Sequence, residues 1–382
     1  MSNKKVLHII TVSFVINHFF GKQFSYLKEK TSNQYFLGCS PSDEFFQLSE
    51  SLNYTPFAVN VTRRISPITD LKAIFKIYKF IKDNNIDTVI GHTPKGGMVA
   101  MIAAFFAGVN NRVYFRHGII YETSKGLKRF LLKNIDRLSG TLAKKVVCVS
   151  NSVKKISEHD KLNNPSKNII LGLGTCNGID TENKFNPEKQ DEYLIKDIRN
   201  QTKITDKDFV IGYVGRLVKD KGINELIEAW KTLREEYDHI KLLLVGPIEE
   251  RDSISEESKR MIENDLRIIN TGFVLNAAPY FKLMDVFVLP TYREGFPTVS
   301  LEASSMNLPV LITKATGCTE SIIENKTGVF IKNNAEDIRG KIEFYIENPE
   351  MKQLHGDNGR SFVRENFEET KVWDIIHTKL GY

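Results

Sequence analysis

The chain has 382 residues, more than the ~250–300 at which one hydrophobic core usually splits, so we expect two domains. Its composition, 41% hydrophobic and 26% charged, is that of a globular protein. The four cysteines lie far apart, with neither CxxC nor metal-ligand spacing, which argues against a disulfide framework and favours reduced thiols in the cytosol. The longest apolar run, the twelve residues 98–109, is too short to span a membrane, and we expect it to form a core helix.

The charge is distributed unevenly along the chain. The net charge is +6, but residues 1–180 carry 25 Lys and Arg against 12 Asp and Glu, whereas residues 181–382 carry 28 against 35. A basic half joined to an acidic half indicates that the first half faces a polyanion, either a membrane surface or nucleic acid. An uneven scatter of solvating charge would give the same balance.

Short β-branched runs alternate with helix-like stretches through the whole chain. In the first half we expect strands at 6–10, 34–38, 57–61, 88–90, 112–115 and 146–149. In the second half we expect strands at 209–214, 241–245, 267–270, 286–289, 310–313 and 329–331. Continuously apolar strands separated by helices predict parallel sheets covered on both faces, and hence two doubly wound, Rossmann-like α/β domains.

Polar segments set the expected domain boundaries. We expect an N-terminal domain over 1–180, a linker over 181–207, and a C-terminal domain over 208–360. The remaining segment, 361–382, contains a closing helix that we expect to pack back on the first domain. Open α/β sheets bind ligands beyond the carboxyl ends of their strands. If two such domains face each other across a cleft, the strand-to-helix loops are where the chemistry is expected.

Two cations follow the first strand of the second domain. Arg216 comes directly after that strand and Gly215, and Lys221 precedes the next helix. A planar guanidinium fork and an ammonium point charge in one loop can clamp a diphosphate. Taken alone the signal is weak, because an Arg and a Lys near a helix start are usually just solvated.

The segment YREGFPTVSLE, residues 292–302, supplies a second feature. Its helix is expected to begin near Thr298. The helix N-terminus then presents the amides of Gly295, Phe296, Thr298 and Val299, which favours a bound anion. Gly295 permits close approach of a ligand, and Pro297 gives up an N–H that would be unsatisfied there in any case. The pattern predicts an anion site.

Two acids flank this anion site. Glu294 precedes the helix and Glu302 lies inside it, so each can accept hydrogen bonds from hydroxyl groups of a ligand. An anion site between two hydroxyl acceptors describes a nucleotide-sugar site. One alternative is an ordinary helix-end acid together with a paired buried acid. A glycosidase pair is a further alternative, although hydrolysis gives no use for a cationic diphosphate clamp.

These motifs resemble the retaining glycosyltransferases of family 4, which have the GT-B fold. The resemblance covers residues 140–335 and rests on Glu294-x7-Glu302, Gly215-Arg216 with Lys221-Gly222, Leu244-Val245-Gly246, and the segments 317–320 and 325–328. The stretch 116–126, RHGIIYETSKG, is most similar to bacterial capsule and lipid-linked oligosaccharide members. The loop 11–23 departs from the family, because it retains only Gly21 where a Gly-Gly pair is common.

The resemblance implies a role for each site residue. The donor phosphates would be bound by Arg216, Lys221 and the amides around Gly295, Phe296 and Pro297. Gly246 would lie in the donor site. Glu294 would bind sugar hydroxyls, and Glu302 would bind the ribose. His117, which follows a strand end, would orient or stabilise the transferring sugar. A lone histidine at a strand end is more often structural.

The resemblance also implies that the anomeric configuration is retained. We expect front-face attack, with the donor phosphate accepting the proton of the acceptor. Positioned cations and a helix terminus could stabilise the leaving diphosphate, so neither a metal nor a cofactor is expected. A D-x-D sequence, Asp206-Lys207-Asp208, precedes its strand and so lies away from the carboxyl edge, and we reject it as a metal site.

Two basic segments, 71–82 and 125–145, interleave Lys and Arg with Ile, Phe and Leu. This pattern favours docking on an anionic membrane, where each surface cation contributes about 1 kcal/mol. An outer helix with its apolar stripe on the sheet and its lysines in solvent is the alternative interpretation.

The sequence therefore predicts a peripheral protein on the cytoplasmic face of the cell membrane. It would transfer a hexose or N-acetylhexosamine from a UDP-sugar to a saccharide linked to undecaprenyl diphosphate, in surface polysaccharide assembly. A non-hydrolysing UDP-sugar epimerase shares the fold and remains an alternative. A basic nucleic-acid-binding protein is another, but no nucleic-acid motif supports it, and no nucleic-acid partner is expected.

Overall fold

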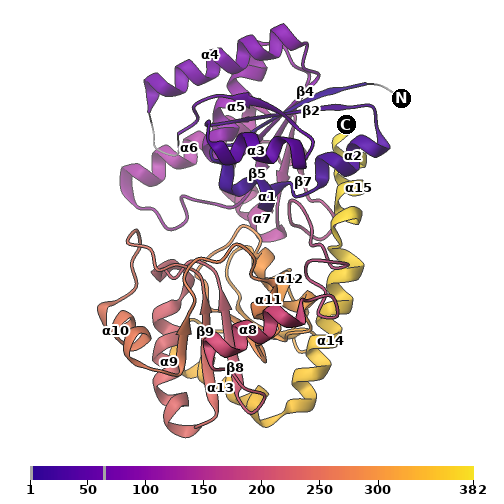
Figure 1. Cartoon of the computed structure of the whole chain (residues 1–382). Helices are drawn as coiled ribbons and strands as arrows, with labels where there is room; N and C mark the ends of the chain where they lie inside the picture. Colours follow the sequence, from indigo (N-terminus) through magenta and orange to yellow (C-terminus); the bar gives the residue numbers. More distant parts are fainter. Residues whose placement is uncertain (1–2, 63–65) are drawn as a thin grey trace. The chain divides into compact units, whose positions relative to one another are not determined.

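The computed structural model describes residues 3–62 and 66–382, which divide into two compact units (Figure 1). Unit 1 contains the described residues up to Gly178 together with Glu369–Tyr382, and unit 2 contains Ile179–Glu368. Each unit is a parallel sheet with helices packed on it, which is the doubly wound, Rossmann-like arrangement.

The sheet of unit 1 has seven parallel strands in the order β3-β2-β1-β4-β5-β6-β7. The strands are β1 (Lys5–Ile9), β2 (Gln34–Cys39), β3 (Thr55–Ala58), β4 (Thr88–His92), β5 (Asn111–Arg116), β6 (Lys145–Cys148) and β7 (Asn168–Ile169). The helices are α1 (Ile16–Phe19), α2 (Gln23–Lys30), α3 (Asp43–Ser51), α4 (Pro67–Asn84), α5 (Pro94–Phe106), α6 (Gly126–Leu142), α7 (Asn151–His159) and α15 (Glu369–Leu380). The strand order reverses between β1 and β4, which is where sheets of this kind bind ligands.

The sheet of unit 2 has six parallel strands in the order β10-β9-β8-β11-β12-β13. The strands are β8 (Phe209–Val214), β9 (Ile240–Val245), β10 (Ile268–Asn270), β11 (Val286–Leu289), β12 (Val310–Thr313) and β13 (Gly328–Ile331). The helices are α8 (Glu192–Thr202), α9 (Ile223–Glu236), α10 (Glu256–Asn264), α11 (Ala278–Phe281), α12 (Thr298–Ser305), α13 (Ala335–Glu347) and α14 (Pro349–Asn366), with a 3-10 turn, η3, at Lys219–Lys221. Here the strand order reverses between β8 and β11.

The central strands are buried on both faces, which explains their continuously apolar sequences. Val286, Phe287 and Val288 of β11 are all fully buried. The apolar run 98–109 forms most of α5, whose Val99 and Met101 lie in the core of unit 1, as expected for a core helix. Within the described residues no helix is both long enough and apolar enough to cross a membrane.

The strand predictions fail at two places on the sheet of unit 1. The third strand begins at Thr55, ahead of the predicted 57–61, and includes Pro56. Proline is tolerated there because β3 is the edge strand and its outer side needs no donor. The two-residue strand β7 was not predicted, because Asn168–Ile169 is too short to give a pattern.

The segment expected as a linker belongs to a unit, and the segment expected as a closing helix is divided between the two units. Residues 181–207 belong to unit 2, where Ile195 and Ile198 of α8 join the core. Residues 361–366 form the end of α14 in unit 2, so of the predicted closing segment only Glu369–Tyr382 belongs to unit 1. In unit 1 the buried Trp373 of α15 donates a hydrogen bond from Nε1 to Asn177 Oδ1 at 2.8 Å.

Candidate active site

Two loops meet at the switch point of unit 2, one after β8 and one after β11. The amide of Tyr292 donates to the carbonyl oxygen of Asp220 at 3.0 Å, and Arg293 Nη2 lies 3.2 Å from Asp220 Oδ2. The Tyr292 hydroxyl donates to Glu225 Oε1 at 2.6 Å, which ties the second loop to α9. Both loops are therefore held in a fixed relation by the adjacent strands and by these contacts.

Lys221 and Glu294, one from each loop, form an ion pair between Nζ and Oε1. Their side chains are only 16% and 17% exposed. A pair that is this well shielded from solvent is screened less than a surface pair. Removing either charge would therefore leave the other shielded from water without a counter-ion, which is unfavourable. The sequence predicted both residues at this site, but not their contact with each other.

Arg216 lies in the first loop and is 55% exposed, with Nη1 2.8 Å from Glu249 Oε2. The buried Tyr213 hydroxyl donates to the Arg216 carbonyl oxygen at 2.9 Å and fixes the backbone there. Gly246 follows β9 with a φ of +144°, and a Cβ at this position would overlap the carbonyl oxygen of Gly215. Only glycine therefore allows the loops after β8 and β9 to approach this closely.

The N-terminus of α12 lies at the end of the second loop, with Pro297 in the N-cap position and no side-chain cap. Within the described residues, the amides of Gly295 and Phe296 have no hydrogen-bond partner. The amide of Thr298 donates to the carbonyl oxygen of Phe296 at 3.0 Å, so one of the expected anion-binding amides is used internally. An uncapped helix terminus with two open amides can bind an anionic oxygen.

Glu302 lies in α12 and is mostly buried. Burial raises the pKa of its carboxyl to about 7, and Lys184 opposes this shift. A carboxyl with this pKa is partly protonated at neutral pH, and hydrogen bonds donated by a ligand would favour its ionised form. In unit 2, sequence reasoning missed Glu249 and Lys184, because each comes from a loop without a motif.

His117 belongs to unit 1, where it follows β5 and is half-buried. Its Nε2 lies 3.1 Å from His92 Nδ1, and its ring stacks on Phe19 with 4.1 Å between centroids. Burial lowers the pKa of His117 well below its usual value, and His92 and His18 lower it further. The imidazole is therefore neutral at neutral pH.

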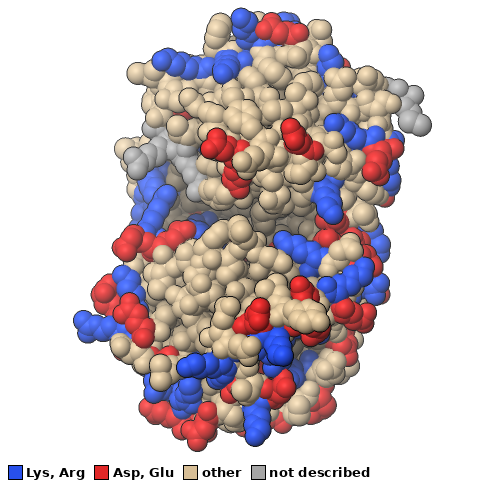
Figure 2. Space-filling view, in the orientation of Figure 1, with Lys and Arg blue, Asp and Glu red and all other residues tan. Residues whose placement is uncertain are grey.

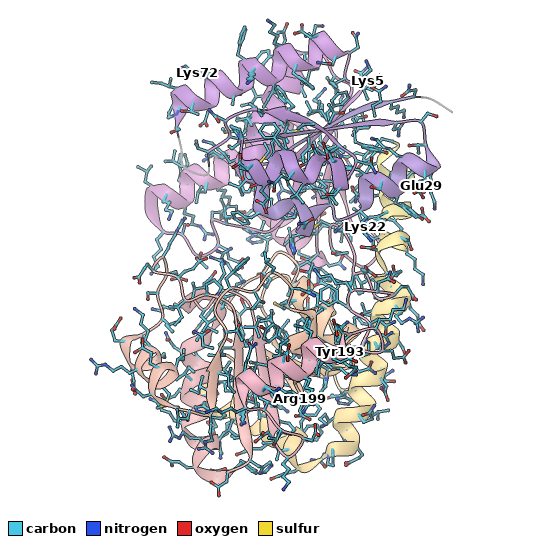
Figure 3. All side chains as sticks on the ribbon, viewed as in Figure 1. Lys5, Lys22, Glu29, Lys72, Tyr193 and Arg199 are labelled. Atoms are coloured by element: carbon cyan, nitrogen blue, oxygen red, sulfur yellow. The ribbon has the colours of Figure 1, made fainter. Side chains whose placement is uncertain are left out.

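The D-x-D sequence lies at the amino end of β8, as expected. Asp206 pairs with Arg199 of α8, which is labelled in Figure 3, at 2.6 Å. Asp208 accepts from the amide of Thr205 at 2.7 Å and lies 3.2 Å from Lys241 Nζ. Both carboxylates thus have local structural partners, at the end of the strand opposite to the loops of the site.

Two family profiles together match most of the chain. Residues 35–182 match the profile of Glycosyltransferase Family 4, and residues 195–362 match that of Glycosyl transferases group 1.

Individual relatives agree with these profiles. The chain is 32% identical, over 99% of its length and 97% of the relative's, to the capsular polysaccharide biosynthesis glycosyltransferase CapM of Staphylococcus aureus. It is 28% identical, over 84% of its length and 81% of the relative's, to an Escherichia coli UDP-Gal:α-D-GlcNAc-diphosphoundecaprenol α-1,3-galactosyltransferase. Among solved structures, Anabaena Alr3699/HepE in complex with UDP-glucose superposes with a TM-score of 0.80 at 19% identity, covering 99% of each chain.

Proposed function

Because the chain belongs to the family 4 glycosyltransferases, we propose that it transfers a hexose or N-acetylhexosamine from a UDP-sugar to a saccharide carried on undecaprenyl diphosphate. The product would enter a surface polysaccharide. The names of the two relatives, one in capsule synthesis and one acting on a diphosphoundecaprenol-linked sugar, support this choice of pathway and acceptor.

The observation that carries the proposal is the Lys221–Glu294 pair beside the open amides of Gly295 and Phe296. A nucleotide sugar contains both kinds of group that this arrangement can bind. Its diphosphate offers anionic oxygens to Lys221, Arg216 and the amides, and its sugar offers hydroxyl donors to Glu294. On this proposal the ribose hydroxyls donate to Glu302.

The proposed transfer retains the anomeric configuration. The bond between the anomeric carbon and the diphosphate oxygen breaks, and its electron pair stays on the diphosphate. The acceptor oxygen bonds to the same face of the sugar, and its proton passes to a phosphate oxygen of the leaving group. Arg216, Lys221 and the N-terminus of α12 stabilise the negative charge that develops on the leaving group, without a metal ion.

The proposal includes docking of unit 1 on an anionic membrane on the cytoplasmic side. Apolar side chains on the outer surfaces of α4 and α6 are exposed; they are Ile68, Leu71, Phe75, Leu127, Phe130 and Leu131. Lysines accompany them, including the exposed Lys72 that is labelled in Figure 3. Figure 2 shows basic side chains and uncharged surface near the top of the view, where Figure 1 places α4, with some acidic atoms beside them. α4 also buries an apolar stripe, Ala73, Ile77 and Ile81, as an ordinary outer helix does. The apolar side chains that remain exposed between the lysines are what favour an anionic interface.

The decisive assay incubates the full chain with a panel of UDP-sugars and a synthetic polyprenyl-diphosphate-linked saccharide, with and without EDTA. We expect transfer from one UDP-sugar at the same rate in both conditions, with the α linkage of the donor retained in the product. Conversion of a UDP-sugar without an acceptor, or loss of transfer on addition of EDTA, would contradict the proposal.

Membrane docking is tested separately by flotation with vesicles. We expect binding to vesicles that contain phosphatidylglycerol at low salt, weaker binding at high salt, and none to neutral vesicles. Equal binding to neutral and anionic vesicles, or no binding to either, would refute electrostatic docking.

A further inference from the structure

Three histidines from three neighbouring strands of unit 1 form a continuous hydrogen-bonded chain. His8 lies in β1, His92 ends β4, and His117 follows β5, and these strands are adjacent in the sheet. His8 Nδ1 lies 3.0 Å from His92 Nε2, and His92 Nδ1 lies 3.1 Å from His117 Nε2. The chain thus runs from the core of the unit through its switch point to the half-exposed ring of His117.

The two inner histidines are in an apolar and aromatic environment. His8 and His92 are 1% and 2% exposed. The His8 ring meets Phe20 and Phe24 nearly edge to face at 5.2 and 5.1 Å between centroids, and the His92 ring stacks on Phe115 at 4.8 Å. Burial lowers the pKa of His8 to about 3 and lowers that of His92 well below its usual value. Both imidazole rings are therefore neutral at neutral pH.

Neutral imidazoles linked in this way must share one tautomeric direction. A neutral ring has one N–H and one lone pair, and each hydrogen bond between two rings needs one of each. If His8 donates from Nδ1, then His92 donates from Nδ1 to His117, and His117 carries its hydrogen on Nδ1. In the reverse direction, His117 has a lone pair on Nδ1 and His8 has a buried N–H on Nε2.

The inner end of the chain distinguishes the two directions. Within the described part of the chain, His8 Nε2 is buried and has no hydrogen-bond partner. A buried N–H without an acceptor is rarer in proteins than a buried acceptor without a donor. The direction that leaves only a lone pair on His8 Nε2 is therefore favoured.

We propose that His92, held by His8, is a positioning residue that fixes His117 in the tautomer with hydrogen on Nδ1, so that His117 meets the donor sugar as a hydrogen-bond donor. This inference rests on the proposed transfer function and on the role that the family resemblance implies for His117, which is to orient or stabilise the transferring sugar. Since Nε2 of His117 is engaged by His92, Nδ1 is the ring nitrogen left for a ligand.

A neutral donor fits the proposed reaction better than an imidazolium does. Positive charge develops at the anomeric carbon as the diphosphate leaves, and a cation beside it would raise the energy of that state. A neutral N–H can orient a sugar hydroxyl without adding charge. His117 then takes no proton from the acceptor, which agrees with the phosphate as the proton acceptor.

The tautomer is measured directly by ¹⁵N NMR of the full chain labelled with ¹⁵N-histidine, because protonated and unprotonated ring nitrogens have well-separated shifts. Loss of one set of signals in His117→Gln assigns the ring. We expect His117 Nδ1 to be protonated and Nε2 to be unprotonated at neutral pH. The opposite pattern, or an imidazolium, would overturn the inference.

His92→Phe keeps an aromatic ring against Phe115 but removes both nitrogens. In this variant we expect His117 to exchange between tautomers and kcat for sugar transfer to fall roughly ten- to a hundredfold, with the donor KM within about threefold. His92→Gln, whose amide can accept from one neighbour and donate to the other, should recover part of the lost rate. His159→Phe, which removes an exposed imidazole from α7, is the matched control and should change neither the tautomer nor kcat.

The two readouts separate failure of this inference from failure of the proposed function. If the wild-type protein transfers no sugar from any nucleotide, the proposed function is wrong, whereas the NMR spectrum still decides the tautomer. If His92→Phe changes the tautomer but not kcat, the positioning role is refuted. If His92→Phe does not fold, the wild-type spectrum still decides the tautomer of His117, and the kcat of His92→Gln tests the positioning role.

Discussion

The Lys221–Glu294 pair leads to a prediction in which two neighbouring charges have opposite effects on UDP binding. In the free protein the two side chains neutralise each other. When UDP binds, its phosphate oxygens give Lys221 a new anionic partner. Glu294 is then released to accept hydrogen bonds from the hydroxyls of the transferred sugar, which UDP alone lacks. Lys221 should therefore favour the binding of UDP. Glu294, left without its cation, should oppose the binding of UDP and contribute instead to the binding and reaction of the transferred sugar.

The size of each effect follows from the contacts. Lys221→Met removes a charge-assisted hydrogen bond of about 1.5–3 kcal/mol, which weakens UDP binding roughly 10- to 150-fold. Glu294→Gln removes the competing carboxylate, so the Kd for UDP should stay within about threefold or become smaller. Its kcat should fall roughly 10²- to 10³-fold if the carboxylate acts on the sugar as charge develops.

Isothermal titration calorimetry with UDP and a transfer assay measure the two effects on the same preparations. Lys219→Met is the matched control, because it removes the same charge from an exposed position two residues away. We expect the control to change the Kd for UDP less than twofold. If Glu294→Gln weakens UDP binding as much as Lys221→Met does, Glu294 acts by positioning Lys221, and the assigned division of roles is refuted.

Three further outcomes are expected. Ligand hydroxyls favour the ionised form of Glu302, whose pKa in the free protein is about 7, so donor affinity should rise with pH up to about 7 and then level off. Calorimetry from pH 5.5 to 8.5 measures this, and Glu302→Gln should remove the dependence. Glu249→Gln removes the carboxylate that lies 2.8 Å from Arg216, so Arg216 is free to bind phosphate and UDP should bind a few-fold more tightly. An unchanged or larger Kd would contradict competition between Glu249 and phosphate for Arg216. Trp373→Ala leaves a cavity in unit 1 and removes the hydrogen-bond donor to the side chain of Asn177. Urea titration should therefore show a free energy of unfolding that is about 3–5 kcal/mol lower. An unchanged midpoint would show that α15 does not stabilise the unit.

Sequence alone predicted the strands of both sheets well where the strands are central. Val286–Leu289 and Phe209–Val214 were predicted with their observed bounds, because strands buried on both faces are continuously apolar and end sharply at glycine or proline. The edge strand with Pro56 was misplaced, since an edge strand is under weaker constraint on both composition and hydrogen bonding.

The candidate site was predictable to the level of its loops but not of its contacts. Arg216, Lys221 and Glu294 could be assigned to one edge of one sheet because each follows a strand or opens a helix. Their partners depend on strand order and loop path, neither of which is encoded locally. For the same reason the sequence marked His8 only as a residue within a strand, and its link to His92 depends on β1 lying beside β4.

The ion pairs of the free protein also bear on how the site would distinguish substrate from product. A ligand that offers phosphate alone satisfies Lys221 but leaves the carboxylate of Glu294, which is only 17% exposed, without its cation. Leaving such a group unpaired is costly. A nucleotide sugar satisfies both halves of the pair, since its hydroxyls donate to Glu294 while its diphosphate binds Lys221. The Lys221–Glu294 pair would therefore favour the intact donor over the released nucleotide, and Glu294→Gln should reduce that preference.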